Sequence, residues 1–410
     1  MKKVLFLIGC LSMCTGCSLF QSSTSLLKPP ELPVKQQEVK QAIGKYVPAQ
    51  AEWVSPIEDK QANKMIEADL DQDHTNELIV FYKLPDQTSQ MEAIVLKEEK
   101  GTWKETLKLK DLGRELHKVE FMDLNNDGFK EILVGFSFSE DASDKALIVY
   151  DVSKGKPKKL MESQYSAFFS GNFSNDTKGE ILLASLIPNQ EHSVRLYQFD
   201  KNNVSVLDEL KLDPYVYPYY HSSSGSISPS LKGVVLDAGV GAHSSTSFII
   251  GVRKDKLMNI LPDNLKQEEL FRAYAVNSED SNGDGIIEFT IQREASSESL
   301  AYADMPFINE YYQLNDQKQA ELIHKYYDNA SYLYRFELPQ DWPAVEVEES
   351  KDGRYVKFLS KKDDSVLFDV YAIDKGQALP KGWNILYETN QFTYVTNYSA
   401  AVGKRLFQPK

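Results

Sequence analysis

Short apolar runs recur along the chain, each flanked by acidic or turn-forming residues. Five of them, at 78–81, 132–134, 181–183, 235–236 and 289–291, directly follow a polar segment rich in Asp, Asn, Ser and Gly. A further strand-like run then precedes a turn, at 93–97, 146–152, 194–199, 247–252 and 311–314. Runs of about four to eight aliphatic, β-branched and aromatic residues between turn formers are typical of β-strands. The pattern predicts a mainly β protein.

The polar segments are copies of one repeat. Three of them place oxygen-bearing side chains at positions one, three, five and nine of a loop: Asp69, Asp71, Asp73 and Glu77; Asp123, Asn125, Asp127 and Glu131; Asp280, Asn282, Asp284 and Glu288. Weaker copies begin at Asn172 and Ser226, and the second of these has no carboxylate. The copies start at 69, 123, 172, 226 and 280, so their spacings are 54, 49, 54 and 54 residues. This near-constant period indicates a repeat architecture.

Each repeat has room for about four short antiparallel strands, with the acidic loop joining the first two. Four-stranded sheets repeated every ~40–60 residues are the building plan of β-propellers. We therefore expect a β-propeller-like array of about five repeats over residues 55–328. A β-sandwich and an open solenoid remain alternatives. From residue 329 to 410 the period stops and short strands continue, which predicts a small, mainly antiparallel C-terminal domain of β or α+β type.

The side chains of the three strong loops are those that calcium prefers. Calcium takes six to eight oxygen ligands at ~2.3–2.6 Å, and alternating Asp and Asn side chains in a tight loop can converge on one ion. Position six must turn sharply, which favours Gly128 and Gly285, and His74 stands there in the first loop. Position seven would contribute its backbone carbonyl, from Thr75, Phe129 or Ile286. An EF-hand is excluded because position twelve is apolar and lies in a strand in all three loops.

This pattern resembles the FG-GAP and VCBS repeats, the calcium-loop blades of integrin α-chain heads and many bacterial surface proteins. The resemblance implies a β-propeller with structural Ca²⁺ in some blades and a binding role. It is strongest at the second and fifth loops, good at the first and partial at the third. The Phe-Gly and Gly-Ala-Pro signatures are not evident, and five repeats are fewer than the integrin seven. Asp, Asn and Gly also form turns without metal, so metal-free loops are the alternative.

The first residues have the layout of a secretory signal. Lys2 and Lys3 precede apolar segments at 4–8 and 11–13, which are too short to span a bilayer. Thr15-Gly16-Cys17 resembles a lipobox, the site at which bacterial (Firmicutes-type) lipoproteins receive acyl chains such as palmitate. We expect a signal peptide at 1–16 and a lipidated Cys17 with a tether at 17–54, in which 35–44 could form a short helix. The protein would sit on the outer face of the cytoplasmic membrane. An ordinary cleaved signal is the alternative.

Charge and cysteine content narrow the range of functions. The formal net charge is −14, and it becomes −16 without residues 1–16. An acidic protein repels phosphate backbones, so nucleic acid is not an expected partner. All three cysteines lie within residues 1–17, which leaves the rest of the chain without a disulfide or a thiol nucleophile.

Signatures of catalysis are weak in this sequence. The six histidines show no zinc spacing, and neither a Gly-x-Ser-x-Gly elbow nor a phosphate loop occurs. Asp237, His243 and Ser244 lie close in sequence, but a Gly-rich bend explains this run as well as a catalytic site does. We expect a non-enzymatic binding or assembly module with a protein or cell-wall partner. An enzyme that processes cell-envelope glycan or peptide on a propeller scaffold is the alternative.

Overall fold

The computed structural model describes residues 34–59, 64–139, 145–174, 176, 178–201, 203–297, 300 and 304–410. The expected signal peptide, Cys17 and residues 17–33 of the expected tether lie outside the described residues. Residues 34–54 of that tether are folded, because helix α1 (Val34–Tyr46) and strand β1 (Glu52–Val54) both pack on the first sheet. The expected short helix at 35–44 is therefore present. Within the described residues, neither helix has the length and apolar character needed to cross a bilayer.

Antiparallel sheets dominate the chain, which confirms the mainly β prediction. The first sheet contains β1, β2 (Ile66–Ala68), β3 (Glu77–Leu84), β4 (Gln87–Glu99) and β5 (Thr102–Leu112). The second contains β6 (Glu115–Met122), β7 (Glu131–Ser137), β8 (Lys145–Asp151) and β9 (Lys158–Gln164). The third contains β10 (Ala167–Gly171), β11 (Glu180–Ile187), β12 (Glu191–Asp200) and β13 (Asn203–Lys211).

The fourth and fifth sheets depart from this four-strand plan. The fourth contains β14 (Tyr219–Ser228), β15 (Leu231–Val240), β16 (Ser244–Arg253) and β17 (Lys256–Asn259), and β18 (Phe271–Arg272), which follows η1 (Gln267–Leu270), pairs with β16. The fifth runs β19 (Phe289–Glu294), β20 (Phe307–Leu314), β21 (Ala320–Asn329), β22 (Tyr334–Glu337) and β28 (Phe407–Pro409). Its expected first strand is reduced to a single bridge between Glu279 and Glu288.

The C-terminal residues form a sixth sheet and also extend the fifth. The sixth sheet has the order β23 (Val345–Glu349), β24 (Tyr355–Ser360), β25 (Val366–Asp374), β27 (Phe392–Thr396) and β26 (Asn384–Glu388), followed in the chain by α2 (Ala400–Leu406). Because β22 and β28 pair within the fifth sheet, strands from both sides of residue 329 share one sheet. One apolar cluster joins the fifth and sixth sheets.

Successive sheets pack face to face, which explains the nearly continuous apolar runs. In β7, Ile132, Val134 and Phe136 face the first sheet, whereas Leu133 faces the third. Alternate residues of a strand point to opposite faces, so a strand with both faces buried needs apolar side chains at every position. Burial of each such side chain stabilises the folded state by ~1.5–3 kcal/mol. The runs with two buried faces lie directly after the acidic loops.

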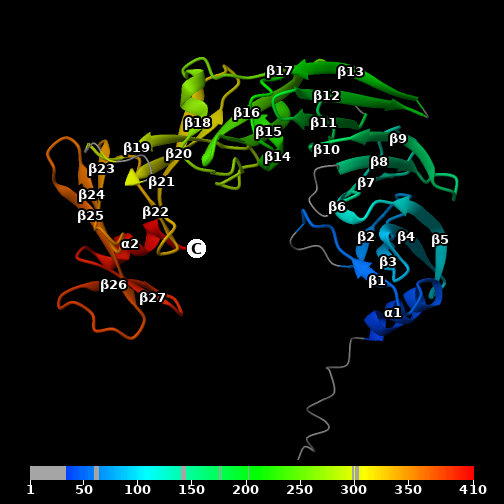
Figure 1. Ribbon diagram of the computed structural model, residues 1–410, viewed down its shortest axis with the longest axis horizontal. Coiled ribbons are helices and arrows are strands. Elements are labelled where there is room, and N and C mark those ends of the chain that lie inside the picture. The colour runs from blue at the N-terminus through cyan, green and yellow to red at the C-terminus, as the bar shows by residue number, and fades with distance from the viewer. Residues whose placement is uncertain are drawn as a thin grey trace, which may run out of the picture.

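Figure 1 shows the six sheets following one another around an arc, with α1 at one end and the sixth sheet at the other. Among the described residues, hydrophobic clusters join each sheet to the next, and none joins the sixth sheet to the first. The array of four- and five-stranded sheets is thus established, without closure into a ring.

The fourth copy of the repeat does not form the expected loop. Residues 226–234 fold as the hairpin between β14 and β15, in which Ser226 pairs with Lys232 and Ser228 pairs with Leu231. Without carboxylates to hold an open loop, Ser and apolar residues continue the ladder to a two-residue turn. The period of 54 residues located the position correctly, but the loop itself is absent there.

Candidate metal sites in the acidic loops

The first three acidic loops occupy equivalent places in their sheets, each between two consecutive strands that pair with each other. They connect β2 to β3, β6 to β7 and β10 to β11, and the fifth loop leads into β19. In the first three loops the position-nine Glu is the first residue of the strand that follows the loop, and in the fifth it directly precedes β19. These four loops therefore lie at one end of the sheets.

Each of the four loops is closed by an equivalent hydrogen bond. The carboxylate of Glu77, Glu131, Glu180 or Glu288 accepts the backbone N–H of the residue seven positions earlier, at 2.6–2.8 Å. All four glutamates are buried, with at most 4% of their surface exposed. A buried carboxylate bonded to the backbone fixes the loop entrance to the strand. The third copy thus has the geometry of the three strong copies.

The first side chain of each strong loop organises its turn. Both oxygens of Asp69 accept backbone N–H groups, from Asp73 at 3.1 Å and His74 at 3.0 Å. Asp123 and Asp280 accept the same two bonds at 2.8–3.2 Å. Position six has the expected positive φ, 69° at His74, 87° at Gly128 and 88° at Gly285. The turn predicted from position six is therefore confirmed.

Position seven supplies a backbone N–H to the carboxylate of position five. Thr75 donates to Asp73 at 2.9 Å, Phe129 donates to Asp127 at 3.0 Å, and Ile286 donates to Asp284 at 2.9 Å. Asn125 and Asn282 at position three accept the N–H of position five through their side-chain oxygens. All predicted loop residues thus lie together in each turn.

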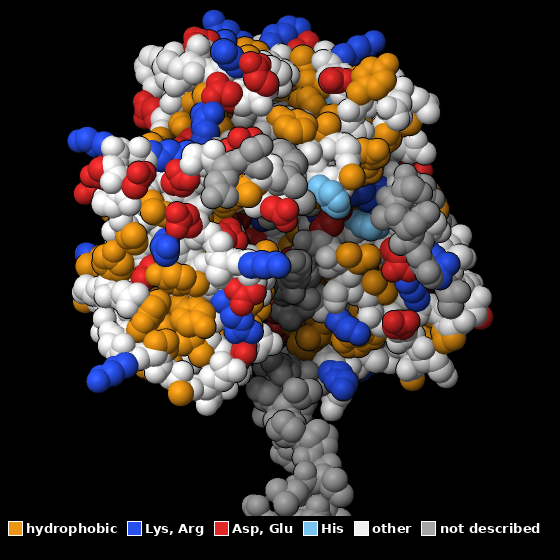
Figure 2. All heavy atoms as spheres, turned by 60° about the vertical axis from the view of Figure 1, so that its left-hand side comes forward, with side chains coloured by type: hydrophobic (Ala, Val, Ile, Leu, Met, Phe, Trp, Pro, Cys, Tyr) orange, Lys and Arg blue, Asp and Glu red, His pale blue; other side chains and the backbone are white. Residues whose placement is uncertain are grey.

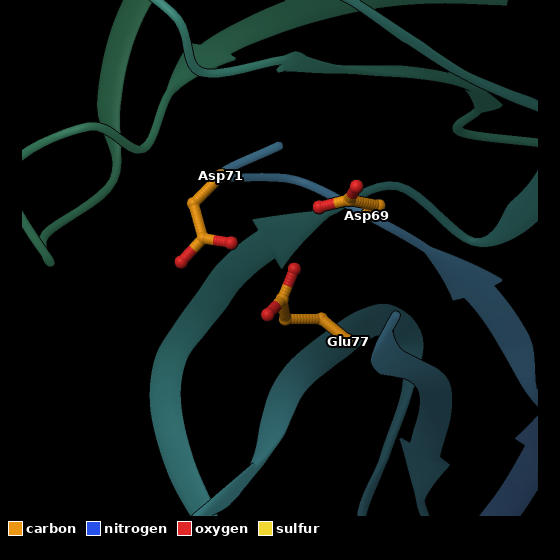
Figure 3. Close-up of side chains that lie close together, drawn as sticks. All are labelled: Asp69, Asp71 and Glu77. Carbon is orange, nitrogen blue, oxygen red and sulfur yellow. The ribbon is translucent and has the colours of Figure 1, made fainter. Parts of the chain in front are cut away.

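In the part of the chain that the structure describes, carboxylates converge in three groups, in each of which one oxygen atom per residue lies within 4.8 Å of the others: Asp69, Asp71 and Glu77; Asp127, Glu131 and Asp151; Asp280, Asp284 and Glu288. Figure 3 shows the first group, in which the side chains of Asp69, Asp71 and Glu77 point toward one another. Asp151, from the end of β8, was not among the predicted residues. It lies across the strand pair from Glu131, since Tyr150 pairs with Ile132.

The second loop concentrates negative charge around a buried group. Glu131 is fully buried, and burial, together with the charges of Asp127, Asp123 and Asp151, raises its pKa to about 7. Its Oε1 also accepts a bond from Asn125 Nδ2 at 2.8 Å. A cation placed among these oxygens would remove the repulsion that raises this pKa.

The third and fifth loops have a neutral amide across from the glutamate. In the fifth, Gln313 Nε2 donates to Asp284 at 2.7 Å and to Glu288 at 2.5 Å, and the first of these bonds lowers the pKa of Asp284. In the third, Gln198 pairs with Glu180, whose pKa is raised by burial. Glu180 Oε1, Asn172 Oδ1 and Ser174 Oγ are buried there without a hydrogen-bond partner. Buried oxygen atoms without a hydrogen-bond partner could serve as ligands of a cation that prefers oxygen, such as calcium.

The first loop differs because a lysine points into it. Lys97 Nζ donates to Asp71, lies 2.7 Å from Asp73 Oδ2 and lies 3.1 Å from Glu77 Oε1. These carboxylates stand at positions three, five and nine, where the sequence predicted calcium ligands. Lys97 lies twenty residues after Glu77, and no pattern in the sequence connected it with this loop.

The fourth repeat contains a buried ion pair rather than a catalytic triad. Asp237 and Arg272 are both fully buried and lie 3.1 Å apart. Asp237 also accepts bonds from Ser247, Ser278 and His221, while His243 and Ser244 are not among the described partners of its carboxylate. Burial opposes ionisation of Asp237, but the bonds from His221 and Arg272 outweigh it and lower its pKa. The group ties the fourth sheet to the start of the fifth repeat.

Among the described residues, two surface pockets lie at the end of the sheets opposite the acidic loops, and another extends along the edge of the fifth sheet as far as Glu279. One of about 590 Å³ is lined by Tyr215 and Phe271, which are 72% and 44% exposed. A second lies between the second and third sheets near Ile187, and a third of about 450 Å³ lies where the fifth sheet meets the C-terminal residues. Figure 2 shows the side with the fifth and sixth sheets, where acidic and basic side chains alternate with hydrophobic patches.

Comparison with known proteins does not assign the chain to a family. No family model matches it, and no curated protein matches it. Among solved structures, it is similar to the Chaetomium thermophilum Sqt1, with 11% identity over 84% of this chain and 95% of that chain and a TM-score of 0.35. It is also similar to the Saccharomyces cerevisiae Sqt1, with 12% identity, coverage of 78% and 80% and a TM-score of 0.32. The exotype rhamnogalacturonan lyase YesX gives 11% identity, coverage of 78% and 76% and a TM-score of 0.27. At these TM-scores the likenesses carry no functional argument.

Proposed function

We propose that this protein is a lipid-anchored, extracytoplasmic binding or assembly module whose propeller-like array of sheets is stabilised by calcium. The acylated residue would be Cys17, and the protein would stand on the outer face of the cytoplasmic membrane. The observation that carries the calcium proposal is the shared loop geometry, in which a buried glutamate closes four loops and three groups of carboxylates converge. Where a calcium ion is bound, it supplies positive charge that neutralises these carboxylates.

The two ends of the sheets have different chemistry, which supports a binding role. The acidic loops occupy one end, where ions would fix each loop to the strand that follows it. Two of the pockets and the exposed side chains of Tyr215, Tyr217 and Phe271 occupy the other. Exposed aromatic side chains are enriched in binding surfaces because they contribute a large contact area with little loss of entropy. We propose that this end contacts a protein or cell-wall partner.

Thermal unfolding in calcium and in chelator tests the proposed role of the metal. A ligand at ~100 times its dissociation constant stabilises the folded state by ~2.7 kcal/mol, so calcium should raise the midpoint. Asp127→Asn and Asp284→Asn should each reduce that response. Asp86→Asn, in the exposed turn between β3 and β4, is the matched control and should leave it intact. A midpoint that is the same in calcium and in chelator would show that the loops are metal-free turns.

One observation favours the alternative of an envelope-processing enzyme. The pocket beside the fifth sheet combines Tyr274, Tyr311 and Tyr327 with two carboxylates of opposite behaviour. Burial raises the pKa of Glu349, whereas the bonds from Arg335 and Lys410 to Asp328 outweigh burial and lower the pKa of that carboxyl. Pairs of carboxyl groups with divergent pKa values are a feature of glycoside hydrolases.

Incubation with purified cell wall separates the two functions. A binding module should sediment with the wall without releasing soluble fragments, and Tyr215→Ala with Phe271→Ala should weaken sedimentation. An enzyme should release reducing ends or peptides, and Glu349→Gln should abolish the release. Lack of sedimentation, without release, would remove the cell wall as partner and leave a protein partner.

A further inference from the structure

The four loops differ in the residue that lies opposite the loop glutamate on the adjacent strand. In the first sheet Leu78 pairs with Leu96, which places Lys97 opposite Glu77. The same register places Asp151 opposite Glu131 and Gln313 opposite Glu288, and Gln198 pairs directly with Glu180. The equivalent residues are thus a cation, an anion and two neutral amides: Lys97, Asp151, Gln198 and Gln313.

The ammonium group of Lys97 takes up most of the free oxygens of the first loop. It has three N–H donors, and it faces one oxygen each of Asp71, Asp73 and Glu77. The second oxygens of Asp73 and Glu77 accept bonds from Thr75 and the backbone of Leu70. With both oxygens of Asp69 bonded to backbone, Asp71 Oδ1 is the remaining loop carboxylate oxygen without a hydrogen bond or ion pair.

Calcium and this ammonium group would compete for the same place. A calcium ion at ~2.3–2.6 Å from these oxygens would lie against Lys97 Nζ, where two cations repel strongly. The three carboxylates of Asp71, Asp73 and Glu77 surround Lys97 Nζ, and their negative charges favour its ammonium form. A cation attached to the same sheet also competes at high effective concentration.

We propose that Lys97 is a built-in cation that replaces calcium in the first loop, so that this loop stays closed without metal. The second and fifth loops, with Asp151 and Gln313 at the equivalent position, would require the ion. This inference rests on the proposed calcium sites of those loops. The metal-free loop also braces the second one, since Lys130 N–H donates to Leu70 O at 2.7 Å and Gln72 donates to Asp123 at 3.2 Å.

The number of calcium ions bound per chain tests this assignment. Lys97→Gln gives the first loop the residue that the fifth loop carries, so native mass spectrometry of the purified protein should show one more bound ion than in the wild type. Gln313→Lys should show one fewer. Lys108→Gln, which removes another lysine of the first sheet from its partner Glu92, is the matched control and should leave the number unchanged.

Each outcome decides one of the two proposals. If the wild type binds calcium and Lys97→Gln binds the same number, the role of Lys97 is refuted while the calcium sites stand. If the wild type binds no ion, the calcium proposal fails, and the Lys97 proposal survives only if Lys97→Gln gains one. Hydrogen exchange of the wild type gives a second measurement: chelation should leave residues 77–84 protected while it speeds exchange in residues 131–137. Equal acceleration in both segments would overturn the inference.

Discussion

The buried carboxyl group of Glu131 connects the stability of the fold with pH and with the proposed binding of calcium. Its pKa is raised to about 7 in the folded protein, so the folded state binds a proton that the unfolded chain releases near its ordinary value of 4.5. Between these two pH values the folded state holds more protons, and the free energy of unfolding therefore falls as pH rises. If calcium binds at the second loop as proposed, it would displace this proton, and calcium affinity should then rise as pH increases through 7.

We predict that, in chelator, the protein loses ~2 kcal/mol of stability between about pH 5.5 and pH 8 through this group, at ~1.36 kcal/mol per pH unit. Urea unfolding at the two pH values measures the loss, and Glu131→Gln should remove it. Glu120→Gln is the control. Glu120 lies in β6, the strand that pairs with β7, and its carboxylate is 2.6 Å from Lys118 of the same strand. A pH dependence that persists in Glu131→Gln would assign the effect to another group.

At the same scale, the sequence predicted the loop side chains but not their cross-strand neighbours. Asp69, Asp123 and Asp280 were identified because loop ligands are local in sequence. Lys97 and Asp151 were missed because each lies twenty residues after its glutamate, and their approach depends on the register of a hairpin. The shared spacing of twenty residues was the available signal.

At the scale of elements, α1 is the cover for the free face of the first sheet. Ile43 of the helix and Val47, directly after its end, pack with Leu78, Val80 and Tyr82 of β3, all of them buried. On the other five sheets the corresponding face packs against the preceding sheet. The helix therefore replaces a neighbouring sheet at the start of the array.

We predict that Ile43→Ala lowers the free energy of unfolding by ~2–5 kcal/mol, because it opens a cavity between α1 and β3. Denaturant unfolding measures the loss. Lys40→Ala, on an exposed position of the same helix, is the control and should change stability little. Equal effects of the two substitutions would mean that α1 does not seal this face.

The prediction of strands and loops was correct where the local sequence pattern determines the structure, and it was wrong where distant contacts or missing side chains do. The runs after the acidic loops are strands because apolar residues at consecutive positions require two buried faces. The fourth copy was placed correctly by its period, yet its Ser-rich residues form a hairpin because no carboxylate holds the turn open. The weak first strand of the fifth repeat also escaped the pattern, since β18 and the Arg272–Asp237 pair occupy that part of the junction.

At the scale of the whole molecule, the repeat period predicted a succession of similar sheets, and the arc in Figure 1 has that succession. Closure into a ring could not be read from the sequence, because contacts between the first and last sheets leave no local pattern. The addition of β22 and β28 to the fifth sheet was equally unpredictable, since residues 407–409 join it from about seventy positions away.

The position of α1 has a mechanical consequence. With the proposed anchor at Cys17, any pull between membrane and partner enters the fold at Val34 and reaches the helix before it reaches a sheet. A helix held by side-chain packing yields at lower force than strands held by a ladder of backbone hydrogen bonds. The helix would then detach first. The acidic loop of the first sheet would still be held by Lys97, a cation that is part of the chain and cannot exchange with the solvent as an ion does. The end of the protein nearest the proposed anchor would therefore keep its stability when the calcium concentration outside the cell changes.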